Sequence, residues 1–128
     1  MTAFFVPGKP VQQGSMRIYN NRSVHTSANE LKAWREMVGW KAKEARVEKV
    51  PEHEPVIIYL TFVFVRPKSV KREFPTVFPD LDKLLRSILD GLTGIAYHDD
   101  AQVVEIHTKK RYGETPGVEV SVGYLQSL

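Results

Sequence analysis

The sequence has 128 residues, 42% hydrophobic and 26% charged, a composition typical of one soluble globular domain, here expected to span residues 1–128. The absence of cysteine excludes disulfides, cysteine-ligated zinc and thiol nucleophiles. The sequence contains no run of about 18 apolar residues, the length needed to span a membrane. The 18 Lys and Arg residues outnumber the 15 Asp and Glu residues by three, which is compatible with a polyanionic partner.

The first part of the chain predicts two short strands and one long helix. The β-prone runs Thr2–Val6 and Met16–Tyr19 flank a polar stretch and are expected to be strands. Ser27 and Glu30 have the spacing of a capping box, and apolar residues then recur at helical intervals. We therefore expect a helix over about Ala28–Glu48.

The second part of the chain predicts three strands and a second helix. The apolar run Val56–Val65 lacks alternation, which indicates a central strand covered on both faces. An apolar stripe predicts a helix over Leu81–Leu92, with Gly94 as a stop signal. Gln102–Tyr112 and Val118–Tyr124 have the patterns of strands. Together these elements predict an α+β fold with a mixed β-sheet and two main helices.

The five aspartates are segregated, because all of them fall within one window of 21 residues. Asp80 and Asp82 open the second predicted helix, where carboxylates can accept bonds from free N–H groups and complement the helix dipole. Such capping does not account for Asp99 and Asp100, which precede a predicted strand. If the two pairs converge, protons or a cation must neutralise them, and oxygen ligands without cysteine favour Mg²⁺ or Mn²⁺.

A cation follows the first aspartate pair at helical spacing. Arg86 is one turn from Asp82, where it could bind a phosphate oxygen or stabilise developing negative charge. Asp90 is one turn further, and we expect it to form either a salt bridge with Arg86 or a polar contact at the helix end. A bound metal ion would lower the pKa of an attacking water in phosphodiester hydrolysis. Hydrolysis of a small phosphorylated substrate is the alternative, although the surrounding basic residues count against it.

The stretch PDLDKLLRSILDGLTGIAYHDDAQVV, Pro79 to Val104, resembles the RusA family of Holliday junction resolvases. That family's signature is D-L-D-N-L-x-K, then I/F-L-D-A-L-T, then D-D-A-Q-V. Weaker similarity extends upstream to His25–Ser27 and to the early Pro-containing strand. The resemblance implies a small RusA-like domain that forms a homodimer, binds four-way DNA junctions and, with Mg²⁺, nicks two strands symmetrically. It also implies a bacterial or phage-encoded protein, which we expect to be cytoplasmic.

The resemblance assigns roles to the residues that match the signature. Asp80 and Asp82 match the first motif and Asp100 matches the second aspartate of D-D-A-Q-V, so these three are the expected catalytic metal ligands. Asp99 matches the first aspartate of that motif and is expected to support metal binding. Arg86 replaces a functional lysine of the family, which keeps the positive charge but changes the hydrogen-bond geometry.

Basic residues flank the aspartates and are expected to contact DNA phosphates, although a solvated charged surface is the alternative. Lys83 belongs to this group and stands where the family usually has asparagine. A non-catalytic module that binds branched DNA with the same fold remains the alternative to an enzyme. The candidate DNA-binding residues are Arg66, Lys68, Lys71, Arg72, Lys83, Lys109, Lys110 and Arg111.

The histidines and tryptophans give weaker signals. His98 and His107 are expected to be polar surface residues rather than metal ligands. Trp34 belongs to the apolar stripe of the first long helix and is expected in the core. Trp40 lies off that stripe, and whether it contacts a second subunit is open.

Overall fold

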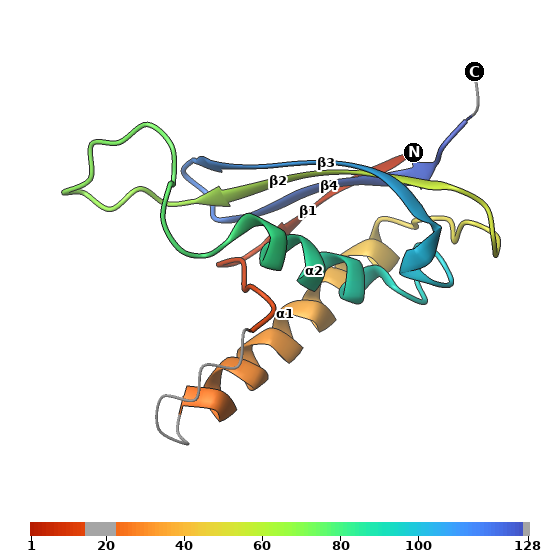
Figure 1. Ribbon diagram of the computed structural model, residues 1–128, viewed down its shortest axis with the longest axis horizontal. Coiled ribbons are helices and arrows are strands. Elements are labelled where there is room, and N and C mark those ends of the chain that lie inside the picture. Colours follow the sequence, from red (N-terminus) through yellow and green to blue (C-terminus); the bar gives the residue numbers. More distant parts are fainter. Residues whose placement is uncertain (15–22, 127–128) are drawn as a thin grey trace.

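The computed structural model describes residues 1–14 and 23–126. In the second range, side chains are described from residue 28 onward. One four-stranded sheet has the order β1-β4-β2-β3, and two helices lie on one side of it (Figure 1). This arrangement confirms the predicted α+β fold with a mixed sheet, whereas the predicted strand Met16–Tyr19 falls outside the described residues. The elements are β1 Thr2–Pro7, α1 Ser23–Glu44, β2 Val56–Phe64, α2 Leu81–Leu92, a 3₁₀ helix Asp100–Gln102, β3 Val103–Tyr112 and β4 Gly117–Tyr124.

The central strand β2 pairs parallel with β3 and antiparallel with β4. Two parallel neighbours need a crossover connection, and here the chain returns across the sheet through α2. The start of α2 therefore follows the carboxyl end of β2, while its end leads back to the start of β3 at the opposite end of the sheet (Figure 1). After β3 the chain turns beside the carboxyl end of β2, where Gly113 N–H donates to the Phe64 carbonyl at 2.9 Å.

The core lies between the sheet and the two helices. Alternate residues of β2, such as Ile58 and Phe62, are fully buried and belong to one cluster with Leu84 and Ile88 of α2. On the opposite face of β2, Tyr59 is 42% exposed. The expectation that this strand is covered on both faces was therefore wrong, because the two helices cover one face of the sheet and no described helix covers the other (Figure 1).

Helix α1 begins and ends earlier than the sequence indicated. It starts at Ser23, so Ser27 lies inside the helix and does not cap it. At the other end Arg46 adopts a positive φ of 59°. The N–H groups of Arg46 and Val47 donate back to carbonyls of the last turn at 3.0 and 3.1 Å, which is a Schellman motif. A non-glycine residue provides this stop, so the sequence carried no glycine signal for it.

The two helices approach closely at a glycine. A Cβ built on Gly91 of α2 would lie 3.1 Å from the Val38 Cβ of α1, so a larger residue there would force the helices apart. Trp34 of α1 is 5% exposed, which confirms its place in the core, whereas Trp40 is 71% exposed. No helix within the described part of the chain is both long and apolar enough to cross a membrane.

The role of α2 in the core can be tested by removing one buried side chain. We expect Ile88→Ala to lower the free energy of unfolding by about 2 to 5 kcal/mol, because it leaves a cavity between α2 and the sheet. The measurement is urea denaturation. The control is Val104→Ala, at a position that is 62% exposed, which should change it by less than about 0.5 kcal/mol. Equal losses in the two variants would contradict the packing described.

Candidate active site

The first aspartate pair lies at the start of α2. Asp80 is the N-cap residue with extended backbone angles, yet its side chain makes no capping hydrogen bond. That side chain is 56% exposed, and Lys83 Nζ lies 3.5 Å from its Oδ2. Asp82 is also exposed, in the first turn of α2, where a negative charge is favoured by the helix dipole. Both carboxylates are therefore accessible to a cation or to solvent.

The second aspartate pair lies in the loop before β3. Asp99 caps the short 3₁₀ helix, because its Oδ1 accepts from Ala101 N–H at 2.9 Å. The side-chain oxygen of Gln102 accepts from the N–H groups of His98 and Asp99 at 2.7 and 3.1 Å. Its amide nitrogen donates to two backbone carbonyls of the loop before β2, at 2.8 and 3.0 Å. Gln102 is 8% exposed and thus anchors the loop that carries both aspartates.

Asp100 is exposed but surrounded by negative charge. Partial desolvation raises the pKa of its carboxyl group, and so do a hydrogen bond shared with the Asp99 carboxyl and the charges of Asp99 and Asp90. The guanidinium of Arg86 acts in the opposite direction. A carboxyl group in such surroundings favours a proton or a cation beside it.

The structure places the two aspartate pairs at opposite ends of α2, a helix of 12 residues and hence about 18 Å. Among residues 1–14 and 28–126, no group of three or more His, Asp or Glu side chains is arranged to hold a metal ion. The four aspartates therefore do not form one cluster in this chain. Mg²⁺ usually keeps several waters and binds one or two carboxylates together with substrate phosphates. Each exposed pair fits such an open site, and not an all-protein cage.

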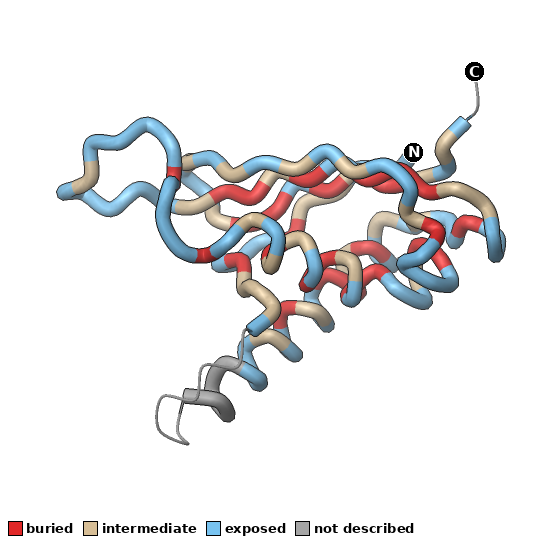
Figure 2. Tube along the Cα trace, in the orientation of Figure 1, coloured by how far each residue is buried: buried red, intermediate tan, exposed pale blue. Residues whose placement is uncertain are grey.

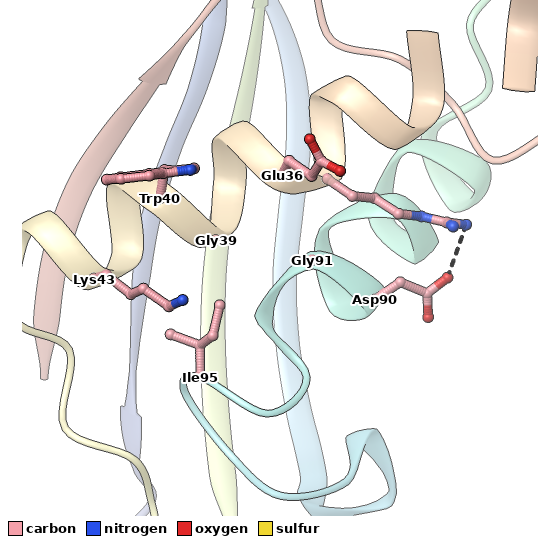
Figure 3. A pocket seen from close by; sticks show the side chains of 8 residues that line it. Glu36, Gly39, Trp40, Lys43, Asp90, Gly91 and Ile95 are labelled. Carbon is pink, nitrogen blue, oxygen red and sulfur yellow. Dashed lines mark hydrogen bonds and ion pairs between the residues drawn. The ribbon is translucent and has the colours of Figure 1, made fainter. Parts of the chain in front are cut away.

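Asp90 pairs with Arg35 of α1 and does not form the expected salt bridge with Arg86. Its Oδ2 lies 3.1 Å from the Arg35 guanidinium of α1, which also donates to Gln13 Oε1 at 2.6 Å. Packing of α1 against α2 brings Arg35 to Asp90, and this contact could not be read from spacing along one helix. Figure 3 shows Asp90 at the rim of a shallow pocket of about 320 Å³ between the helices.

The candidate DNA-binding residues fall into two groups. The loop from residue 65 to 80 is largely exposed (Figure 2), and Lys68 and Lys71 on it are free of ion pairs with described residues. The two arginines of this loop have partners within the chain. Arg66 lies 5.1 Å from the centre of the Tyr112 ring, and Arg72 Nε donates to the Tyr112 hydroxyl at 3.0 Å.

The basic residues of β3 also differ from one another. Lys109 is exposed, and Arg111 pairs with Glu119 at 2.9 Å. Lys110 is half-buried, and its ammonium donates to the carbonyls of Val77 and Pro79, each at 2.9 Å. This lysine is therefore engaged with the segment that leads into α2.

Both histidines examined in the sequence are exposed, as expected. The ring of His107 stacks on Tyr59, with centroids 4.7 Å apart and an interplanar angle of 9°. Its Nε2 lies 2.8 Å from a Glu105 carboxylate oxygen. These contacts lie on the face of the sheet away from the helices.

Comparison with known proteins decides the family. A family model described as Endodeoxyribonuclease RusA matches residues 7–123. The chain belongs to the RusA endodeoxyribonuclease family. It is 32% identical over 133 residues to an uncharacterized protein, YqaN, of Bacillus subtilis (strain 168), covering 93% of each chain. It is 29% identical over 112 residues to the crossover junction endodeoxyribonuclease rusA of Lactococcus phage r1t, covering 86% of this chain and 79% of that protein.

Sequence reasoning missed several residues around the candidate site. Gln102 was not singled out, although its four hydrogen bonds hold the Asp99–Asp100 loop. Phe74 and Phe78, on the loop of residues 65–80 between β2 and α2 (the basic loop), are 58% and 74% exposed. Their signal was present, because aromatic residues between cations are typical of surfaces that bind unpaired nucleic acid. Gln12 had no signal, since it acts through a contact with the distant Asp80.

The crowding of charge around Asp100 predicts a pH-dependent effect on stability. Because its pKa is raised in the folded protein, the ionised group disfavours the folded state, and this penalty grows as pH rises above the unfolded value of about 3.9. In chelator, Asp100→Asn should therefore raise the melting temperature at pH 7 by a few degrees. The gain should vanish near pH 3, where the wild-type carboxyl is protonated. A lower melting temperature at pH 7, or an equal gain at both pH values, would contradict this.

Proposed function

We propose that this protein is a Mg²⁺-dependent endonuclease, with Mn²⁺ as a possible substitute, that resolves four-way DNA junctions by paired symmetric nicks. Its place would be recombination and repair of DNA in the bacterial cytoplasm, whether the chain is bacterial or phage-encoded. Membership of an endodeoxyribonuclease family supports the nuclease activity, and the phage relative is named for crossover junctions. The observation that carries the proposal furthest is the pair of exposed carboxylates at the start of α2. The Asp80 side chain makes no capping hydrogen bond there, although Asp80 is the N-cap residue.

Each aspartate has a proposed part in holding the metal. Asp80 and Asp82 are the proposed ligands at the start of α2, and Asp100 is the proposed ligand at its far end, so the three do not hold one ion together within one chain. Asp99 supports Asp100 while it caps its own short helix. When bound, the metal supplies an activated water and neutralises charge on the leaving oxygen. Arg86 is exposed on α2, one turn from Asp82, where its guanidinium can bind a nonbridging phosphate oxygen.

The proposed DNA surface starts from the exposed basic loop between β2 and α2. Lys68 and Lys71 offer charge to the phosphate backbone, which predicts an affinity that falls steeply with added salt. Phe74 and Phe78 offer exposed rings on which unpaired bases at a branch point can stack. This loop leads directly to Asp80, so DNA held by the loop would lie beside the first carboxylates.

We propose a homodimer because of the reaction itself. One site cuts one strand, and resolution of a four-way junction needs two coordinated nicks. A two-fold symmetric dimer supplies two equivalent sites facing two equivalent strands. Binding without cleavage, as in a non-catalytic junction-binding module, is the competing outcome, and the absence of a three-ligand group within the described chain is the observation on its side.

The test of this function separates cleavage from binding. We expect Asp82→Asn to lower the rate of junction cleavage in Mg²⁺ by at least about 100-fold, because the amide keeps the shape but loses the charge. Its affinity for a labelled junction in chelator should not fall. The measurements are denaturing gels for cleavage and a mobility-shift titration for binding.

The matched control is Glu105→Gln, which makes the same chemical change at an exposed position on β3. It should cleave the junction like the wild-type protein. Retained cleavage by the Asp82→Asn variant would exclude Asp82 from the site, and a wild-type protein that binds but never cuts in Mg²⁺ or Mn²⁺ would favour the binding module.

A further inference from the structure

The peptide group between Pro79 and Asp80 is hydrogen-bonded on both sides by distant parts of the chain. The Pro79 carbonyl accepts from Lys110 Nζ of β3 at 2.9 Å. The Asp80 N–H donates to the side-chain oxygen of Gln12, in the segment after β1, at 2.8 Å. One peptide plane, immediately before the proposed ligand Asp80, is thus fixed from two directions.

Two further contacts strengthen this arrangement. Lys110 Nζ also donates to the Val77 carbonyl at 2.9 Å, so two of its three donors are used on the chain leading into α2. The backbone N–H of Gln13 donates to the carbonyl of Lys83 in the first turn of α2 at 3.0 Å. The start of α2 is therefore held by contacts from outside the helix.

The Asp80 carboxylate itself is not used to cap α2. An N-cap aspartate ordinarily uses its side chain to bond N–H groups of the first turn. Here the Asp80 side chain makes no such bond, and its backbone is fixed by Gln12 and Lys110 instead. The direction of this exposed carboxylate, whose charged neighbour is Lys83, then depends on the orientation of the peptide plane that precedes it.

We infer that Lys110 and Gln12 are positioning residues for the reaction, which orient Asp80 without contacting the DNA. This inference rests on the proposed function, because it assumes that Asp80 serves in cleavage. It also replaces the interpretation of Lys110 as a phosphate contact. Lys110 is half-buried with its ammonium on two carbonyls, while its neighbour Lys109 is exposed on the alternate face of β3.

The adjacent lysines provide a matched pair of variants. We expect Lys110→Met to lower the single-turnover cleavage rate at saturating protein by about 10 to 100-fold, since a displaced catalytic group costs that much. Its junction Kd in chelator should stay at the wild-type value. Lys109→Met removes the same charge from the exposed position, and it should weaken junction binding and reduce the salt slope by about one. Lys110→Arg retains a donor and should recover most of the lost rate.

Gln12 tests the same peptide from its other side. Gln12→Leu should lower the cleavage rate in the same way as Lys110→Met, again without a change in Kd. The double variant should lose less than the product of the two single effects, because both act on one peptide group. Independent, multiplying effects would show that the two side chains do not act together on Asp80.

A measurement that does not depend on DNA cleavage distinguishes failure of this inference from failure of the proposed function. Amide hydrogen exchange at Asp80 in the free protein should be slow, and it should accelerate in both the Gln12→Leu and Lys110→Met variants. Unchanged exchange at Asp80, or a Lys110→Met variant that alters Kd and not rate, would overturn the inference. A wild-type protein that never cuts would overturn the proposed function, while exchange would still report whether Asp80 is held as described.

Discussion

The parallel pairing of β2 with β3 is the constraint on which the rest of the structure depends. Parallel neighbours cannot be joined by a tight turn, so the chain must cross the sheet between them. The crossover carries α2, whose apolar stripe, including Leu84 and Ile88, completes the core against the buried side chains of β2. A long exposed loop precedes α2 and a short anchored loop follows it. The segments with candidate chemistry are thus the two connections of one crossover.

This topology places the two aspartate pairs at opposite ends of α2. The Asp80 end of α2 adjoins the basic loop, and the segment after β1 and the far part of β3 tie it down. The Asp99–Asp100 end is held by buried Gln102 and carries carboxyl groups that repel one another. Each end pairs a rigid backbone with exposed carboxylates. Such open sites suit a hydrated Mg²⁺ that takes its remaining ligands from water and substrate phosphate.

The fold was largely predictable because local patterns and tertiary packing agree. The stripe from Leu81 to Leu92 predicted α2 with its observed bounds, since its period matches the single face that it buries. The failures came from contacts between distant elements or from unusual backbone. Arg46 ends α1 in a left-handed conformation that ordinarily marks a glycine. The partner of Asp90 depends on how two helices pack, and the engagement of Lys110 depends on a loop returning to β3.

We propose above that this chain makes paired cuts at a four-way junction. The most direct measurement uses a supercoiled plasmid that extrudes a cruciform, incubated with wild-type protein in Mg²⁺ or chelator. Two coordinated nicks convert the circle to linear DNA, whereas one nick relaxes the plasmid and removes the cruciform. We expect Mg²⁺-dependent linear product with ends at the base of the cruciform. Nicked circles alone would contradict paired cutting, and intact plasmid in both Mg²⁺ and Mn²⁺ would contradict the nuclease.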